Sequence, residues 1–380
     1  MSKASELANL IGNINAGGGG VNRNIVINGA MNVAQRGTSS TGIGGSSGYF
    51  TCDRWLIAQS GDGRLTMSQD SSVPTGKGFA HSLKLDCTTA DTSIASSEFL
   101  QIVQKIEGQN LQSIGKGSSD AKPITLSFYV KANAVFNFVC ELNDLDNSRH
   151  ISKLFSTTTD WVKHEITFPA DTTGAFDNDN AASLNLTFWL HAGSTYSSGT
   201  LNTASFASRT DANRAAGVSS FYSSTDNNFF ITGVQLEVGQ NPTEFEHEPF
   251  ETTLARCKRY FQKSYNYSDA VGTVTNDARV YWQTSQQWGV TSVPTGPIIQ
   301  GYITLHPSLR ATATVVPYSP VSGTANRIVL GSASSSDVTP NAWLQQAPSN
   351  VHIGYPQNTG GAGFANDDHV LFHWTADSEL

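Results

Sequence analysis

The feature that most constrains the fold of this chain is a series of short apolar runs separated by turn residues. Between residues 24 and 248 each run is bounded by clusters of Gly, Pro, Asn, Asp or Ser. Runs of this length and spacing are typical of antiparallel β-sandwiches. The expected strands are 24–27, 54–59, 82–87, 99–106, 124–131, 136–142, 162–168, 184–190 and 229–237. The pattern predicts an all-β jelly roll over residues 24–248.

A second, shorter series of β-type runs follows in residues 266–380. The expected strands are 279–283, 298–305, 311–316, 327–331 and 369–374. Prolines bound several of these runs, which is typical of edge strands joined by tight loops. At a soft prior of about 150 residues per domain, the chain is long enough for two or three domains. We expect a second, smaller β-sandwich at the C-terminal end.

Residues 249–265 have a helical period instead. Pro249 suits a first helical position, with acidic residues before and after it and basic residues toward the other end. Leu254, Cys257 and Phe261 lie on one stripe of such a helix. We expect a connecting helix over 249–265 whose stripe lies at a domain or subunit junction.

The N-terminal segment 1–23 predicts a short amphipathic helix on a tether. Leu7, Leu10 and Ile11 recur at helical spacing, and four glycines follow at 17–20. A helix this short is marginal by itself, so we expect these three residues to dock on a neighbouring protein. The segment lacks the apolar core of a secretory signal, and no apolar run approaches the roughly 18 residues of a membrane span.

Composition excludes some partners. The net charge is −8, from 23 Lys and Arg against 31 Asp and Glu, and no basic stripe is present. Nucleic-acid binding depends on such a stripe, so nucleic acid is not an expected partner. Only 14% of the residues are charged, against roughly 25% in typical soluble domains, and Ser, Thr, Asn and Gly fill the polar positions. That balance favours a β-rich protein.

The cysteines predict thiols rather than bridges or a metal centre. Cys52, Cys87, Cys140 and Cys257 are far apart in sequence and form no CxxC pair. We expect them to be reduced and mostly buried, in a protein made in a reducing cytoplasm.

Several segments, in order along the chain, resemble a known family. They are "NIVINGAMNVAQRGTS", "DRWLI", "QKIEGQNLQ", "ITLSFYVKA", "FFITGVQLEVG", "TEFEHEPFETTLARCKRYF" and "FHWTADSEL". Together they resemble the tail-fibre and related virion structural proteins of bacteriophages and prophages. The resemblance implies a virion protein with a first domain similar to jelly-roll carbohydrate-binding modules, a variable C-terminal tip and a symmetric assembly, most often a homotrimer. Glu248 stands where the family usually has Arg.

The sequence offers little for catalysis or for a metal. No GxSxG, HExxH or phosphate-binding glycine loop is present. Three pairs of carboxylates are two residues apart: Asp144 with Asp146, Asp177 with Asp179, and Glu244 with Glu246. On a strand, each pair would share one face, as the two carboxylates of a glycosidase do. Solvated turns explain these pairs better. We expect no cofactor, with a structural calcium ion in these loops as the alternative. His369 and His373 lie in a strand-like run, where four residues span about 13 Å, too far for one ion.

Aromatic side chains are the candidates for sugar binding, since their rings stack on pyranose faces. Trp189 and Tyr129 lie in apolar runs and are expected to be structural. Trp288, Trp343 and Tyr302, in the C-terminal domain, are the glycan-binding candidates.

The leading functional hypothesis is a non-catalytic fibre of the virion that attaches the particle to host surface polysaccharide. Its expected partners are other virion proteins at the N-terminus and a host glycan, without membrane insertion. The alternatives are a purely structural virion component and a polysaccharide depolymerase.

Overall fold

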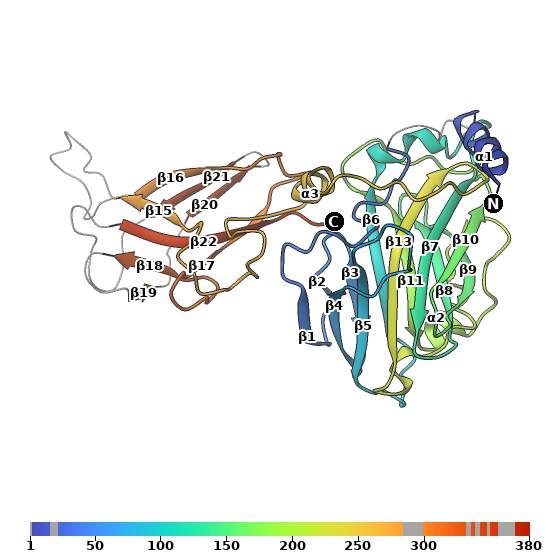
Figure 1. Ribbon diagram of the computed structural model, residues 1–380, viewed down its shortest axis with the longest axis horizontal. Coiled ribbons are helices and arrows are strands. Elements are labelled where there is room, and N and C mark those ends of the chain that lie inside the picture. The colour runs from blue at the N-terminus through green and yellow to red at the C-terminus, as the bar shows by residue number, and fades with distance from the viewer. Residues whose placement is uncertain are drawn as a thin grey trace. The chain divides into compact units, whose positions relative to one another are not determined.

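A computed structural model describes residues 2–15, 22–283, 299–331, 336–338, 343–347, 350–355 and 369–380. The chain divides into two compact units (Figure 1). Unit 1 comprises Met1–Ala34, Thr38–Thr253 and Leu380, and unit 2 comprises Gln35–Gly37 and Leu254–Glu379. Both units are built from antiparallel strands, which confirms the predicted all-β class. None of the described helices is long and apolar enough to cross a membrane.

Unit 1 is a sandwich of two antiparallel sheets. Sheet A has the order β1 (Ser39–Ile43), β4 (Arg64–Asp70), β5 (Ser82–Thr89), β13 (Asn228–Val238), β7 (Ile124–Ala132) and β10 (Val162–Phe168). Sheet B has the order β12 (Ala207–Ser208), β9 (Arg149–Ser156), β8 (Asn137–Asp144), β11 (Ala182–Ala192), β6 (Phe99–Glu107), β3 (Leu56–Ser60) and β2 (Gly48–Tyr49). The chain passes repeatedly from one sheet to the other, as from β6 to β7 and from β10 to β11, which is the jelly-roll pattern.

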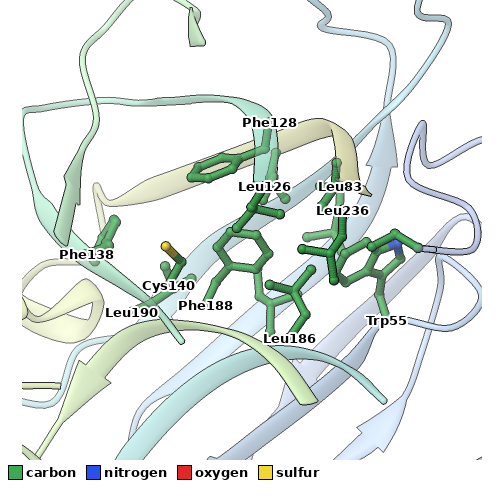
Figure 2. Packing of buried hydrophobic residues seen from close by; sticks show 14 of the residues in the cluster. Trp55, Leu83, Leu126, Phe128, Phe138, Cys140, Leu186, Phe188, Leu190 and Leu236 are labelled. Atoms are coloured by element: carbon green, nitrogen blue, oxygen red, sulfur yellow. The ribbon is translucent and has the colours of Figure 1, made fainter. Parts of the chain in front are cut away.

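The core of unit 1 fills the space between the two sheets. Alternate residues of β11, among them Leu186, Phe188 and Leu190, point into it and are fully buried. Figure 2 shows Phe188 beside Phe128 of sheet A, with their ring centroids 5.1 Å apart. Trp55 packs against the Phe188 ring, with the two ring centroids 6.4 Å apart. Sheet pairing is therefore secured by a continuous aromatic and aliphatic layer.

Several expected strands of unit 1 are confirmed almost residue for residue, but others were wrong or missed. Strand β4 was missed because polar residues fill its outward positions, and β9 because Lys153 lies between its inward Ile151 and Phe155. Residues 24–27 form no strand. The Asn24 side chain takes over that pairing: its Oδ1 accepts from the Val26 and Leu236 amides, and its Nδ2 donates to the Val234 carbonyl. The strand expected from Arg54 begins at Leu56, because Arg54 has φ +73° and lies in a turn.

In its described residues, unit 2 contains a six-stranded antiparallel sheet built on the long strand β22 (His369–Asp377) and a separate three-stranded antiparallel sheet. Strands β14 (Phe261–Lys263), β15 (Val280–Gln283), β17 (Thr314–Tyr318) and β18 (Ile328–Gly331) all pair with β22, and β19 (Ser336–Val338) pairs with β18. The other sheet has the order β16 (Ile299–Thr304), β21 (Asn350–Tyr355) and β20 (Trp343–Ala347). The core of unit 2 contains the buried Phe372 and Trp374 of β22 together with Val315, Ile328 and Leu305.

The helices are few. Helix α1 spans Lys3–Asn15, α2 spans Ser194–Ser197 and α3 spans Phe250–Lys258. The prediction that one helix runs over 249–265 and includes Phe261 is wrong, because α3 ends at Lys258 and Phe261 opens β14. Pairing of Phe261 with Asp377 of β22 outweighs the helical pattern of the sequence. Leu254 and Cys257 do lie on α3, in unit 2. Single 3-10 turns lie at Gly108–Asn110, Gln112–Ile114, Asp211–Asn213 and Phe221–Ser223.

The four cysteines are free and buried, which confirms the expectation from their spacing. Burial raises the pKa of Cys52 and Cys140 to about 12 and that of Cys87 to about 11. Their thiolates are therefore scarce near neutral pH, and these three residues serve as small core side chains.

Candidate functional site

The candidate site is a cleft in unit 2 with a volume of about 540 Å³. Ligand sites commonly enclose about 300–1,000 Å³, so the cleft has room for a small ligand or part of a chain. Its lining combines aromatic rings, hydroxyl groups, guanidinium groups and carboxylates. The lining residues are Arg36, Phe261, Val271, Arg310, Thr312, Thr314, Val316, Tyr318, Thr375, Asp377, Ser378 and Glu379.

Strand register sets the floor of the cleft. Thr375 and Asp377 alternate along β22 with the core residues Trp374 and Ala376, so they project from the opposite face of the sheet. On one side of β22, Phe261 of β14 is opposite Asp377. On the other side, Thr314 of β17 is opposite Asp377 and Val316 is opposite Thr375. The three strands thus present alternating hydroxyl and apolar groups on one surface.

Arg36 forms one wall of the cleft, although it comes from a segment more than 200 residues earlier than its neighbours. Its guanidinium carbon lies 3.8 Å from the centroid of the Phe261 ring. Its Nη2 lies 2.9 Å from Asp377 Oδ2 and 3.4 Å from Glu379 Oε1. A planar guanidinium suits this combination of ring stacking and carboxylate pairing. Asp377 keeps 40% of its side chain exposed and so has capacity left for a ligand hydroxyl.

Arg310 holds the end of β22 from the other side. Its Nε donates to the Ser378 carbonyl at 2.6 Å and its Nη2 to the Glu379 carbonyl at 3.1 Å. Fixed walls reduce the entropy that a ligand has to remove on binding.

Tyr318 is supported from below by two further rings. The Tyr265 ring stacks on buried His373 with centroids 3.9 Å apart and contacts Tyr318 edge-on at 6.2 Å. His373 Nε2 lies 3.1 Å from the Thr275 carbonyl, which can only accept, so this nitrogen carries hydrogen and Nδ1 accepts from the Ser264 hydroxyl. Burial lowers the pKa of His373, which keeps the ring neutral near pH 7. His373 is therefore a satisfied structural histidine on a strand.

The structure places the predicted glycan-binding residues only in part. Tyr302 lies on β16 opposite His352, and Trp343 lies on β20 opposite Gly354, two positions apart along β21. The side chains of both, and the whole of Trp288, fall outside the described residues. These assignments remain predictions.

Tyr281 is an exposed aromatic residue that was not among the predicted candidates. Tyr281 is 55% exposed and stacks on His369, with ring centroids 4.9 Å apart and planes 22° apart. Its neighbour Trp282 points the other way and packs against the core. Alternation along "VYWQ" was the available signal, because an inward Val280 and Trp282 require an outward Tyr281.

The residues predicted to dock on a neighbouring protein lie on α1, as expected for a helix over this segment. Leu7 is 57% exposed and Ile11 is 49% exposed. The side chain of Leu10 is outside the described part of the chain. Two large apolar side chains of this helix are therefore exposed to solvent, and the docking role remains a prediction.

The carboxylate pairs have structural partners. Asp144 ends β8 fully buried, with its Oδ2 2.6 Å from Lys116 Nζ, so it does not share an exposed strand face with Asp146. Asp146 accepts from the Asp177 amide. The carboxylate of Glu246 accepts from the amides of Asn22 and Asn24. Within the described residues no group of three His, Cys, Asp or Glu side chains is arranged to hold a metal ion.

The outer face of sheet B is closed by residues 193–220. Glu141 of β8, fully buried, accepts two bonds from Arg214 at 2.8 and 3.0 Å and one from Trp189 Nε1 at 2.9 Å. His150 Nδ1 lies 3.2 Å from Glu141 Oε1. Burial would raise the pKa of Glu141, but these hydrogen bonds and the charge of Arg214 outweigh burial and lower it. Trp189 is thus structural, with the Arg214 guanidinium 4.9 Å from its ring centroid.

Fold and cleft together define an all-β protein of sandwich units with a ligand-sized cleft in unit 2. No family model and no curated protein matches the chain. Solved structures with some similarity include the enzymatically active domain of bacteriophage CBA120 tailspike protein 4, at 12% identity and a TM-score of 0.28, covering 49% of this chain and 19% of that one. A family 11 carbohydrate-binding module from Clostridium thermocellum has 11% identity and a TM-score of 0.26, covering 56% and 99%.

A third solved structure with some similarity is the N-terminal cellulose-binding domain of β-1,4-glucanase C from Cellulomonas fimi. It has 12% identity and a TM-score of 0.26, covering 55% of this chain and 100% of that domain. Similarity at this level leaves the function to be argued from the residues of this chain.

Proposed function

We propose that the protein is a non-catalytic attachment fibre of a virion, made in the host cytoplasm, that binds polysaccharide on the host surface. The observation that carries this proposal is the cleft of unit 2. Its ring surface at Tyr318, its threonine hydroxyls and the part-exposed Asp377 are groups with which proteins bind sugars. Assembly as a homotrimer would join weak sites, and multivalency raises their combined affinity.

The cleft favours binding over hydrolysis. A glycosidase needs one carboxyl group that stays protonated until it reacts. Asp377 and Glu379 both pair with the one Arg36 guanidinium, at 2.9 and 3.4 Å. A carboxylate pair engaged by one cation is arranged to accept hydrogen bonds from sugar hydroxyl groups.

Binding of the full-length protein to host lipopolysaccharide and capsule fractions tests the proposal. Tyr318→Ala is expected to weaken binding by about tenfold or more, because a ring wall contributes about 1.5–3 kcal/mol when a ligand covers it. Tyr267→Ala is the matched control, since Tyr267 is an exposed tyrosine of unit 2 outside the cleft. Wild-type protein that binds no host fraction, or equal losses in both variants, would contradict the proposal. Release of reducing sugar would show a depolymerase instead.

We also propose that α1 docks the protein on another virion component through Leu7 and Ile11. Replacing both with serine is expected to leave unit 1 folded, since both side chains are largely solvent-exposed. The variant protein should be soluble yet missing from purified particles, as judged by immunoblot. Ser5→Ala on the same helix serves as the control. Normal incorporation of the double variant would refute docking by this helix.

A further inference from the structure

The outer face of sheet A carries aromatic rings where a solvent-facing sheet surface is usually polar. Phe230 of β13 lies between two lysines in the register, opposite Lys84 of β5 on one side and Lys131 of β7 on the other. Lys131 Nζ lies 4.5 Å from the Phe230 centroid, and Lys84 Nζ lies 5.4 Å from it. Trp161 continues the row, with its ring centroid 6.2 Å from that of Phe230.

A second group of rings adjoins this row on the same face. Tyr129 is two residues before Lys131 on β7, and its ring centroid lies 5.7 Å from that of Phe79. Phe79 in turn lies 5.0 Å from Phe245. We call Lys84, Phe230, Lys131 and Trp161 the aromatic–lysine row.

Charge within the row is concentrated at Lys131. Lys84 is paired with Asp86 at 2.9 Å. Lys131 Nζ instead bonds the Ser72 hydroxyl at 2.6 Å and lies 5.5 Å from the Trp161 centroid. No carboxylate of the described residues lies within salt-bridge distance, 4.0 Å, of this ammonium group. A cation held over two rings and a hydroxyl keeps its charge available to an anion from solution.

We infer that the aromatic–lysine row is a binding site for an acidic polysaccharide, distinct from the cleft of unit 2. The half-buried Trp161 ring would stack on a sugar face while the adjacent Lys131 ammonium pairs with a carboxylate or sulfate group on that sugar. The positive charge of Lys131 favours this ligand over a neutral glycan, whereas the net charge of −8 of the whole chain disfavours polyanion binding at its other surfaces. The inference does not depend on the proposed role of the cleft.

The test compares binding of the full-length protein to alginate, dextran sulfate and neutral dextran. We expect binding to at least one acidic polymer, no measurable binding to dextran, and an affinity that falls with added salt. Lys131→Gln and Trp161→Ala should each weaken acidic binding by about tenfold or more, whereas Lys131→Arg should retain most of it. Lys122→Gln in unit 1 is the matched control for loss of one lysine charge.

Two outcomes would overturn the inference. One is binding to dextran as tight as to both acidic polymers. The other is acidic binding that survives Lys131→Gln but is lost in Tyr318→Ala, which would assign it to the cleft. Alginate against dextran sulfate distinguishes a carboxylate ligand from a sulfate ligand. Unfolding temperatures of Lys131→Gln and Lys131→Arg identify any loss of fold.

Discussion

Replacing Arg214 with alanine is expected to lower the free energy of unfolding of unit 1 by about 3–5 kcal/mol. The change removes the two hydrogen bonds that Arg214 donates to Glu141. The Glu141 carboxylate, which is fully buried, then lacks its cationic partner. It also removes the guanidinium from the Trp189 ring. Because residues 193–220 contain Arg214, their cover over sheet B should loosen first. Denaturant unfolding with tryptophan fluorescence measures both effects.

Arg209→Ala is the control, since Arg209 is 38% exposed and lies 4.0 Å from the exposed Asp211. Exposed pairs contribute about 0–1 kcal/mol, so this change should be nearly neutral. Equal effects of the two substitutions would show that the buried pair does not secure the fold.

The pKa of Glu141 is lower in the folded than in the unfolded protein. The stability that ionised Glu141 contributes is therefore present above the unfolded pKa of about 4.3 and is lost as the pH falls below that value.

Asp144→Ala is expected to destabilise unit 1 by a similar amount, about 3–5 kcal/mol. Lys116 Nζ lies 2.6 Å from Asp144, and only 3% of the Lys116 side chain is exposed, so the change removes a partner from a buried ammonium group. Asp171, at 3.2 Å, keeps one contact with the same group. Thermal unfolding of the full-length protein checks this prediction.

Asp177→Ala is the matched control, because Asp177 lies in an exposed turn. Little change in its unfolding temperature is expected. A stable Asp144→Ala protein would mean that Asp171 and the carbonyls of Thr173 and Gly174, which already bond Lys116, suffice to hold its ammonium group. This pair of variants also bears on the depolymerase hypothesis, since any activity lost in Asp144→Ala alone would reflect lost fold rather than lost chemistry.

Local pattern predicted much of the β-architecture. In "ASLNLTFWLHA" the alternation of Leu184, Leu186 and Phe188 with other residues indicates a strand, and the structure confirms it as β11, which is buried on both faces. "RLTMSQD" was missed because only Leu65 and Met67 mark its inward face. Phe261 was placed on a helix because its spacing from Cys257 fits the helical period, whereas pairing with β22 decides its actual state.

The candidate site was predicted less well than the fold. The cleft of unit 2 joins Arg36, Phe261 and Tyr318 with the end of β22, four stretches that are distant in sequence. Aromatic candidates were chosen by their polar neighbours, a local criterion that cannot report what lies across a sheet. The aromatic–lysine row has the same origin, since Lys84, Phe230 and Lys131 meet only through strand register.

The sequence by itself determined the all-β class, the amphipathic N-terminal helix and the buried free thiols, because periodicity, turn residues and cysteine spacing act over a few neighbouring residues. Only the tertiary structure decided which charges are buried in pairs, as with Glu141 and Arg214, and which side chains line the cleft. The physical reason is that pairing and burial depend on how strands and turns pack in space, and this packing brings together residues as far apart in sequence as Arg36 and Asp377.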